Sequence, residues 1–196
     1  MNIIEKTYKW KGSLTKRKST KYIILHHRAG NGDAESIHTL HLNQGYTGIG
    51  YNFYIRKDGS VYRGRPIDTS GAHCIGQNNV SVGICFEGNF ENEKMSDTQI
   101  KAGSELLSYI KKIYPKAEIK RHKDLYATAC PGKNFPFEKI IKGINTKTKL
   151  TSANDIIWEL SQRMEISEVD KAVKALEKAK KEDSSLYWIL YKIVND

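Results

Sequence analysis

The sequence has no long apolar run and only four prolines. None of its stretches approaches the roughly 18 to 20 consecutive apolar residues that a membrane-spanning helix needs. The first 20 residues carry many lysines and no apolar centre, unlike a secretory signal. With 196 residues, 39% of them hydrophobic, the chain can form one globular domain with a buried core and a small appendage. We therefore expect a soluble protein that stays in the cytoplasm until another agent releases it.

Cysteine is also scarce, and the three cysteines are Cys74, Cys85 and Cys130. An odd number in a chain without an export signal does not suit a disulfide framework, so each is expected to be a free thiol or a metal ligand. Cys85 lies in the apolar stretch SVGICFEGNF and is expected to be a small buried side chain. Cys130 stands directly before a Pro-Gly turn, eight residues after His122, and is the more informative cysteine.

Acidic residues are outnumbered, which gives a net charge of +10. Residues 1–22 hold seven Lys/Arg residues against one Glu, whereas residues 146–196 hold nine of each sign. More than half of the excess therefore lies in residues 1–22, and residues 1–20 are interpreted as a basic N-terminal arm. A basic arm suits a polyanion, which could be nucleic acid, anionic lipid or an acidic cell-wall polymer. Composition does not choose among these.

Strand patterns alternate with helix patterns over residues 21–143, which predicts a mixed α/β domain. The β-branched run at residues 21–27 and the apolar run at residues 79–90 predict buried strands. Residues 116–122 predict a short strand that carries His122 at its end. Asp58-Gly59, between two alternating runs, predicts a hairpin with a two-residue turn.

Two helices are expected within this domain. Asp33 is a candidate cap for a helix over residues 34–43, with Ile37 and Leu40 on its inner face. Ser96 is a candidate start for a helix that runs to about residue 113 and stops before Pro115. The elements together favour a mixed central sheet flanked by helices.

The C-terminal quarter has a different pattern. Residues 144–152 are polar and lack apolar periodicity, which predicts a linker. Residues 153–196 contain three helical patterns whose apolar stripes have to be buried against one another, so we expect a small three-helix unit. Cell-wall targeting and dimerisation are both open for this unit, and the oligomeric state is not indicated.

Histidines at predicted strand ends, together with Cys130, form a candidate metal site. A catalytic zinc ion has three protein ligands from His, Cys and carboxylate residues, with water in the fourth place. His26 or His27, His122 and Cys130 would supply such a set. Histidines at strand ends are as often simply hydrogen-bonded, so spacing alone leaves both interpretations open.

Four motifs occur in one register: IILHHRAG, GIGYNFYIRKDGSVYRGRP, GAHCIGQNNVSVGICFEGNF and RHKDLYATACPG. Together they resemble the zinc-dependent N-acetylmuramoyl-L-alanine amidases, a family that includes phage endolysins and peptidoglycan recognition proteins. The resemblance covers about residues 20–140. It implies a mixed sheet flanked by helices, with Zn²⁺ in a groove that binds peptidoglycan.

The resemblance also implies roles for particular residues. The first histidine of the pair, His26, would be the zinc ligand together with His122 and Cys130. Tyr51 aligns with the family's catalytic tyrosine. His27 would be a hydrogen-bonded or packing neighbour.

Three further positions follow from the same resemblance. Thr128 stands where some phage members have a lysine that stabilises the developing oxyanion. A threonine offers one neutral hydrogen bond there, which leaves more of the electrostatic work to the metal. His73 and Asn78 fall among residues that line the substrate groove, and a role in stabilising the loop is the alternative for His73.

The expected function is therefore a peptidoglycan hydrolase, most simply an endolysin that cleaves the amide between N-acetylmuramic acid and L-alanine during host cell lysis. The alternative is a recognition module of the same fold that binds peptidoglycan without cutting it. Members that only bind commonly lack the cysteine, which is present here. Teichoic acid or an anionic membrane is the expected target of the basic arm, and no nucleic acid is expected.

Overall fold

The computed structural model describes residues 1–144, which belong to one compact unit. Its centre is a six-stranded sheet with the strand order β1-β4-β3-β5-β2-β6. The strands are β1 Ile3–Ile4, β2 Tyr22–His27, β3 Phe53–Ile55, β4 Val61–Arg63, β5 Ser81–Phe86 and β6 Glu118–Arg121. All neighbouring pairs are parallel except β3 with β4. The predicted mixed sheet is therefore confirmed.

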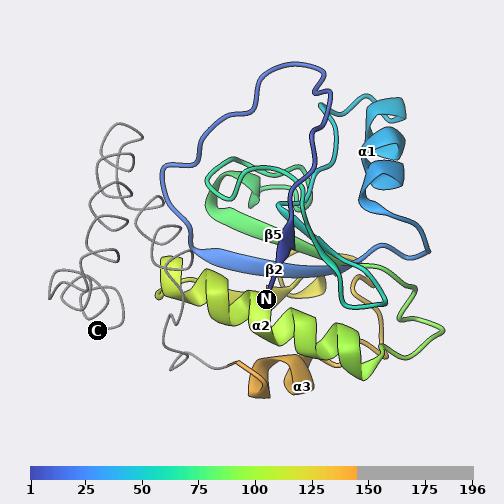
Figure 1. Cartoon of the computed structure of the whole chain (residues 1–196). Helices are drawn as coiled ribbons and strands as arrows, with labels where there is room; N and C mark the ends of the chain where they lie inside the picture. Colours follow the sequence, from blue (N-terminus) through green and yellow to red (C-terminus); the bar gives the residue numbers. More distant parts are fainter. Residues whose placement is uncertain (145–196) are drawn as a thin grey trace, which may run out of the picture. The chain divides into compact units, whose positions relative to one another are not determined.

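Three α-helices accompany the sheet within residues 1–144: α1 Ala34–Asn43, α2 Asp97–Ile113 and α3 Phe137–Lys142. The carboxylate of Asp33 accepts a hydrogen bond from the Ser36 backbone N–H, and the Ser96 hydroxyl accepts one from Gln99. Both predicted caps are thus confirmed, whereas the short α3 was not predicted. Figure 1 shows α2 and α3 on one side of the sheet and α1 apart from them.

Two groups of buried side chains hold these layers together. The larger lies between the sheet and α2 and α3, and the smaller joins α1 to the opposite face. Successive side chains of β2 point to opposite faces of the sheet, and both faces are covered, so the side chains on each face are buried. The central strands β2 and β5 are therefore buried along almost their whole length, which fixes the strand ends on which the candidate site depends.

Two details of the predicted elements differ from the structure. Leu40 is 45% exposed, because the inner face of α1 is formed by Ala34, Ile37 and His38. The predicted hairpin exists, but its strands end at residue 55 and resume at residue 61, so the connection is longer than a two-residue turn. Gly59 has φ of 85° in this connection, a conformation that glycine adopts without strain.

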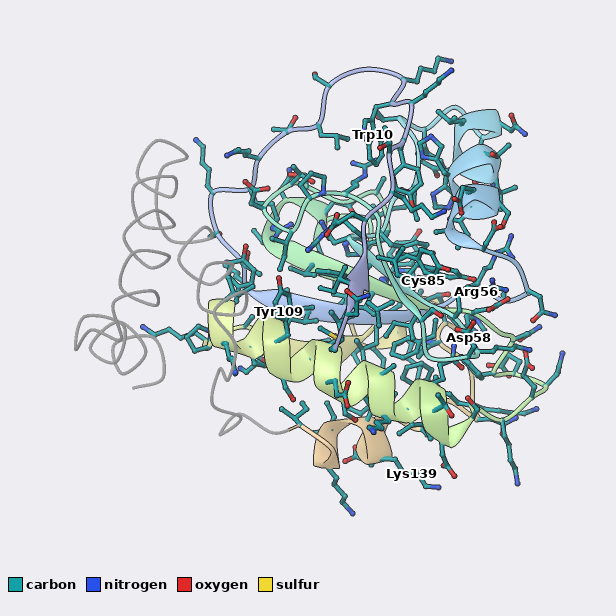
Figure 2. All side chains as sticks on the ribbon, in the orientation of Figure 1. Trp10, Arg56, Asp58, Cys85, Tyr109 and Lys139 are labelled. Atoms are coloured by element: carbon teal, nitrogen blue, oxygen red, sulfur yellow. The ribbon has the colours of Figure 1, made fainter. Side chains whose placement is uncertain are left out.

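The basic N-terminal segment packs along the domain. Its strand β1 pairs with β4, and the backbone N–H of Lys11 donates to the Thr47 carbonyl over 2.9 Å. The Tyr8 and Trp10 rings contact the imidazole of His38 on α1, with centroid distances of 4.7 and 5.3 Å. Figure 2 shows Trp10 on the side of α1. The lysines of residues 1–20 are thus carried on a segment that takes part in the fold.

Most of the predicted linker and the whole predicted three-helix unit, residues 153–196, lie outside the described residues. Among residues 1–144, no helix combines the length and the apolar character needed to cross a membrane.

Candidate metal centre

The candidate site lies at the edge of the sheet where β2, β5 and β6 end. These strands are parallel, so their carboxyl ends meet at one edge, where ligand sites of such sheets commonly lie. β2 ends with His26 and His27, and His122 directly follows β6. Because Leu25 pairs with Arg121, continuing the register places His26 beside His122.

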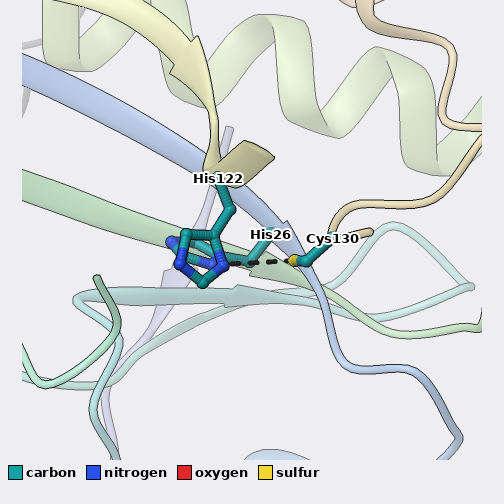
Figure 3. A group of neighbouring side chains, drawn as sticks. All are labelled: His26, His122 and Cys130. Atoms are coloured by element: carbon teal, nitrogen blue, oxygen red, sulfur yellow. Dashed lines mark hydrogen bonds between the residues drawn. The ribbon is translucent and has the colours of Figure 1, made fainter. Parts of the chain in front are cut away.

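His26, His122 and Cys130 come together at this edge. Each offers one ligand atom, and the three atoms lie within 4.8 Å of one another. The His26 Nδ1 atom is 3.8 Å from the Cys130 sulfur, and the two imidazole centroids are 4.4 Å apart. Figure 3 shows these side chains converging from the two strand ends and the loop. Nitrogen, nitrogen and sulfur donors at this spacing suit a zinc ion.

The loop that carries Cys130 is held at both ends. The backbone N–H of Lys123 donates to the Cys130 carbonyl over 2.9 Å. Gly132 has φ of 100°, and a Cβ there would lie 2.5 Å from the backbone of Phe90. The backbone N–H of His27 donates to the Cys130 sulfur over 3.4 Å. The thiol is therefore fixed against the end of β2.

Burial keeps the candidate ligands uncharged before any metal binds. It lowers the pKa of His26 well below its ordinary value and also lowers the pKa of His122. It raises the pKa of the Cys130 thiol to about 12. At neutral pH the imidazoles have lone pairs ready to ligate, whereas the thiol has to lose a proton to a bound metal.

His122 has a ring nitrogen with no partner among the described residues. Its Nε2 atom is buried and makes no hydrogen bond. Buried nitrogen atoms are nearly always paired, because leaving one unpaired costs about 1–3 kcal/mol. This unpaired nitrogen belongs to a ring whose centroid lies 4.4 Å from that of His26, in agreement with a ring that can bind a metal ion.

Tyr51 lies next to the candidate ligands. Its ring centroid is 5.2 Å from that of His26, and the buried thiol of Cys85 on β5 is close enough to influence the pKa of its hydroxyl. Burial, with contributions from Cys85 and Cys130, raises the pKa of Tyr51 well above its ordinary value. The hydroxyl therefore keeps its proton at neutral pH and can act as a donor.

Cys85 is buried, as its apolar sequence context predicted, but its contact with Tyr51 was not predicted. The contact forms because Cys85 and His26 are partners in the β2–β5 register, which brings the thiol into the site. The sequence carried no signal for it beyond the presence of a cysteine in a central strand.

Thr128 lies two residues before Cys130, and its hydroxyl oxygen accepts the Cys130 backbone N–H over 3.2 Å. That bond occupies an acceptor lone pair and leaves the hydroxyl proton to donate elsewhere. His27 was expected to be a neighbour, and its Nδ1 atom accepts the Phe90 backbone N–H over 3.2 Å. The His27 ring is thus engaged with Phe90.

His73 and Asn78, which were predicted to contact substrate, are engaged inside the fold. The Nδ1 atom of His73 is 3.0 Å from the Nε2 atom of His26, and His73 is 9% exposed. The side-chain oxygen of Asn78 accepts the backbone N–H groups of His73 and Cys74 over 2.8 and 3.0 Å. His73 therefore lies against the Nε2 atom of His26. The substrate role of His73 and Asn78 stays a prediction.

Comparison with known proteins gives consistent results. Residues 16–133 match the family model described as N-acetylmuramoyl-L-alanine amidase. The chain is 33% identical over 141 residues to an endolysin of Enterobacteria phage K11, covering 67% of this chain and 92% of that protein. It is 35% identical over 127 residues to peptidoglycan-recognition protein SC2 of Drosophila melanogaster, covering 58% and 69%.

A solved structure agrees with these sequence relatives. The N-acetylmuramoyl-L-alanine amidase LysC from Clostridium intestinale superposes with a TM-score of 0.71 at 39% identity. The match covers 74% of this chain and 99% of that one.

Proposed function

Because this chain belongs to the N-acetylmuramoyl-L-alanine amidase family, we propose that it hydrolyses the amide between N-acetylmuramic acid and L-alanine in peptidoglycan. In this proposal His26, His122 and Cys130 hold one Zn²⁺ ion. The observation that carries it is the convergence of their three ligand atoms within 4.8 Å.

The residues present fit such an ion. The donor set is one that catalytic zinc sites use, and it leaves a coordination position for water or substrate. The buried Nε2 atom of His122 has no hydrogen-bond partner within residues 1–144, so one nitrogen of this ring is not engaged by the protein there. When bound, Zn²⁺ would polarise the scissile carbonyl and lower the pKa of water to near about 7.

The neighbouring hydroxyl groups supply the remaining chemistry. Tyr51 holds its proton at neutral pH, so it can donate a hydrogen bond to substrate or pass a proton to the leaving amine. Thr128 has its oxygen fixed by the Cys130 N–H, and its free proton can be donated to the carbonyl oxygen as charge develops there. Neither residue carries a positive charge, so stabilisation of the oxyanion by protein groups is through neutral donors.

The alternative is a recognition module that binds peptidoglycan without cutting it, as the similarity to a peptidoglycan-recognition protein suggests. The complete donor set favours hydrolysis, because binding a saccharide-peptide needs no buried thiol beside two imidazoles. Hydrolysis is therefore the proposal that accounts for His26, His122 and Cys130 together.

Purified peptidoglycan treated with the full chain tests the proposal. We expect loss of turbidity with new L-alanine amino termini and no new reducing ends. A chelator should abolish the reaction, and added Zn²⁺ should restore it. Cys130→Ser should remain inactive at the same zinc concentration. Binding of peptidoglycan without new amino termini would favour the recognition module, and new reducing ends alone would indicate a glycosidase.

The cellular role follows from the same proposal. We propose that the protein stays in the cytoplasm until it is released to the cell wall during host cell lysis, a role suggested by its similarity to a phage endolysin. The lysines of residues 1–20 would attract teichoic acid or an anionic membrane. Salt-dependent binding of the chain to teichoic acid, weakened when exposed lysines of this segment are replaced, is the expected result.

A further inference from the structure

We propose that His73 is a positioning residue, which fixes the ring of His26 so that its Nδ1 lone pair points at the metal position. This inference rests on the proposed metal site. It replaces the expectation that His73 contacts substrate, and it concerns a group that touches neither the metal position nor the reacting atoms.

The two nitrogens of His26 face different partners. Nδ1 lies 3.8 Å from the Cys130 sulfur, whereas Nε2 lies 3.0 Å from Nδ1 of His73. A histidine that binds a metal through one nitrogen is oriented by the hydrogen bond that the other nitrogen makes. In most sites that partner is a carboxylate or a carbonyl, but here it is a second imidazole.

The hydrogen bonds run from His26 through His73 and Ser81 to the carbonyl of Gln77, and this carbonyl determines which atom donates at each step. The Ser81 hydroxyl donates to the Gln77 carbonyl over 2.7 Å, and a carbonyl can only accept. The Ser81 oxygen is then free to accept from the Nε2–H of His73, which is 3.5 Å away.

With its proton on Nε2, His73 presents an unprotonated Nδ1 to His26. His26 must therefore carry its own proton on Nε2 and donate it to His73. Its Nδ1 atom is left with a lone pair directed towards Cys130. The carbonyl of Gln77 thus sets the ligating tautomer of His26 through two side chains.

The backbone holds the His73 ring in place. A Cβ on Gly71 would lie 2.2 Å from the ring's Cδ2 atom, and a Cβ on Gly83 would lie 2.4 Å from it. The ring therefore fills space that any other residue at these positions would occupy. Gly83 lies on β5 opposite Ile24 of β2, so the ring is supported by the same pair of strands that places His26.

Access argues against substrate contact. His73 is 9% exposed, and both of its ring nitrogens have partners within the fold. A ligand that took hydrogen bonds from this ring would have to break the contact with His26 or with Ser81.

Zinc affinity of the full chain, measured by competition with a chromophoric chelator, tests the proposal. We expect His73→Leu to weaken zinc binding by about 10–100-fold and to shift the visible bands of the Co²⁺-loaded protein. His73→Asn keeps a polar group near the Nδ1 position and should recover much of the affinity. At saturating zinc, KM for a soluble muropeptide should stay near the wild-type value in both variants.

A second route leaves every histidine in place. Gly83→Ala should displace the His73 ring and weaken zinc binding, whereas Gly30→Ala is the matched control, because a Cβ there meets nothing within 4 Å. If His73→Leu does not fold, the comparison of these glycine variants decides.

Unchanged zinc affinity and cobalt spectrum in His73→Leu, with a raised KM, would overturn the proposal in favour of substrate contact. Equal zinc affinity in the two glycine variants would also overturn it. A wild-type chain that binds no zinc would remove the metal site and this inference together. A chain that binds zinc without hydrolysing peptidoglycan would remove only the proposed reaction, since the affinity measurements still apply.

Discussion

Replacing Glu87 with glutamine should destabilise the domain by removing one negative charge and little volume. Glu87 follows β5 directly and is 4% exposed. Its carboxylate accepts the Gly32 backbone N–H over 2.8 Å, and the Lys57 N–H and Arg56 Nε–H over 3.1 Å each. It thereby ties the loop after β2, which follows His26 and His27, to the β3–β4 connection.

The magnitude follows from counting these donors. A glutamine has one carbonyl oxygen, and when that oxygen faces Lys57 and Arg56, its NH₂ group faces the Gly32 N–H. An unsatisfied buried N–H costs about 1–3 kcal/mol. The remaining bonds lose their charge assistance, which adds about 1 kcal/mol. The ion pair itself counts little, because the Arg56 side chain is 34% exposed. We expect a loss of about 2–4 kcal/mol in the free energy of unfolding.

The difference should depend on pH. Burial raises the pKa of Glu87, but the hydrogen bonds from Gly32, Arg56 and Lys57 outweigh it, and the pKa falls below its ordinary value of 4.5. A carboxylate with a lowered pKa in the folded state contributes stability above its unfolded pKa and loses it as the pH falls through the folded pKa. The gap between wild type and Glu87→Gln should therefore be full at neutral pH and shrink below about pH 4.

Urea denaturation followed by circular dichroism, with chelator present so that metal binding does not contribute, measures this gap. Glu118→Gln is the control, since Glu118 is exposed and, within residues 1–144, its side chain pairs only with Lys120, and it should leave the midpoint unchanged. A Glu87→Gln midpoint equal to that of wild type at neutral pH would refute the reasoning. A gap of the same size at about pH 3 would refute its electrostatic part.

Zinc affinity should rise about tenfold per pH unit around neutrality, because the Cys130 pKa of about 12 means that zinc binding displaces one proton from the thiol. Calorimetry in buffers of different ionisation enthalpy would detect the released proton. If no proton is released, the thiolate is not a zinc ligand. Tyr51→Phe should lower kcat by about 100-fold or more while zinc affinity is kept, and an unchanged kcat would exclude a role in proton donation. Trp10→Ala should lower stability by about 1–3 kcal/mol, because the half-buried indole packs on His38. Lys9→Gln, at an exposed position, should instead weaken binding to teichoic acid at low salt and leave the urea midpoint unchanged. A lowered urea midpoint with unchanged binding to teichoic acid would show that Lys9 contributes to stability and not to binding.

The local signals in the sequence predicted the elements that position the site. Asp33 and Ser96 mark helix starts because a cap uses only neighbouring residues, and both helices begin where expected. The run at residues 21–27 predicted β2 because a strand buried on both faces has to be apolar along its length. The three candidate ligands followed from strand ends together with the family motifs, and their convergence agrees with that reasoning.

Contacts between distant segments were not predictable. The bond between His26 and His73 and the contact between Tyr51 and Cys85 depend on how residues outside the strands pack against β2 and β5, which no local pattern encodes. The pairing of β1 with β4 joins residues almost 60 positions apart, and two residues are too few to show alternation. Leu40 was placed inward because helical periodicity alone does not reveal how much of a helix face its neighbours cover.

The wide separation of the candidate ligands affects how the protein matures during synthesis. His26 and Cys130 are 104 positions apart, so a ribosome has to complete nearly the whole domain before the third donor emerges. A bound ion would then join residues 104 positions apart, and because the site exists only in the folded chain, the free energy of binding would add to the stability of the fold. Chain fragments that end before residue 130 would lack the third donor, so an unfinished copy of the protein would be unable to hold the ion in the proposed way.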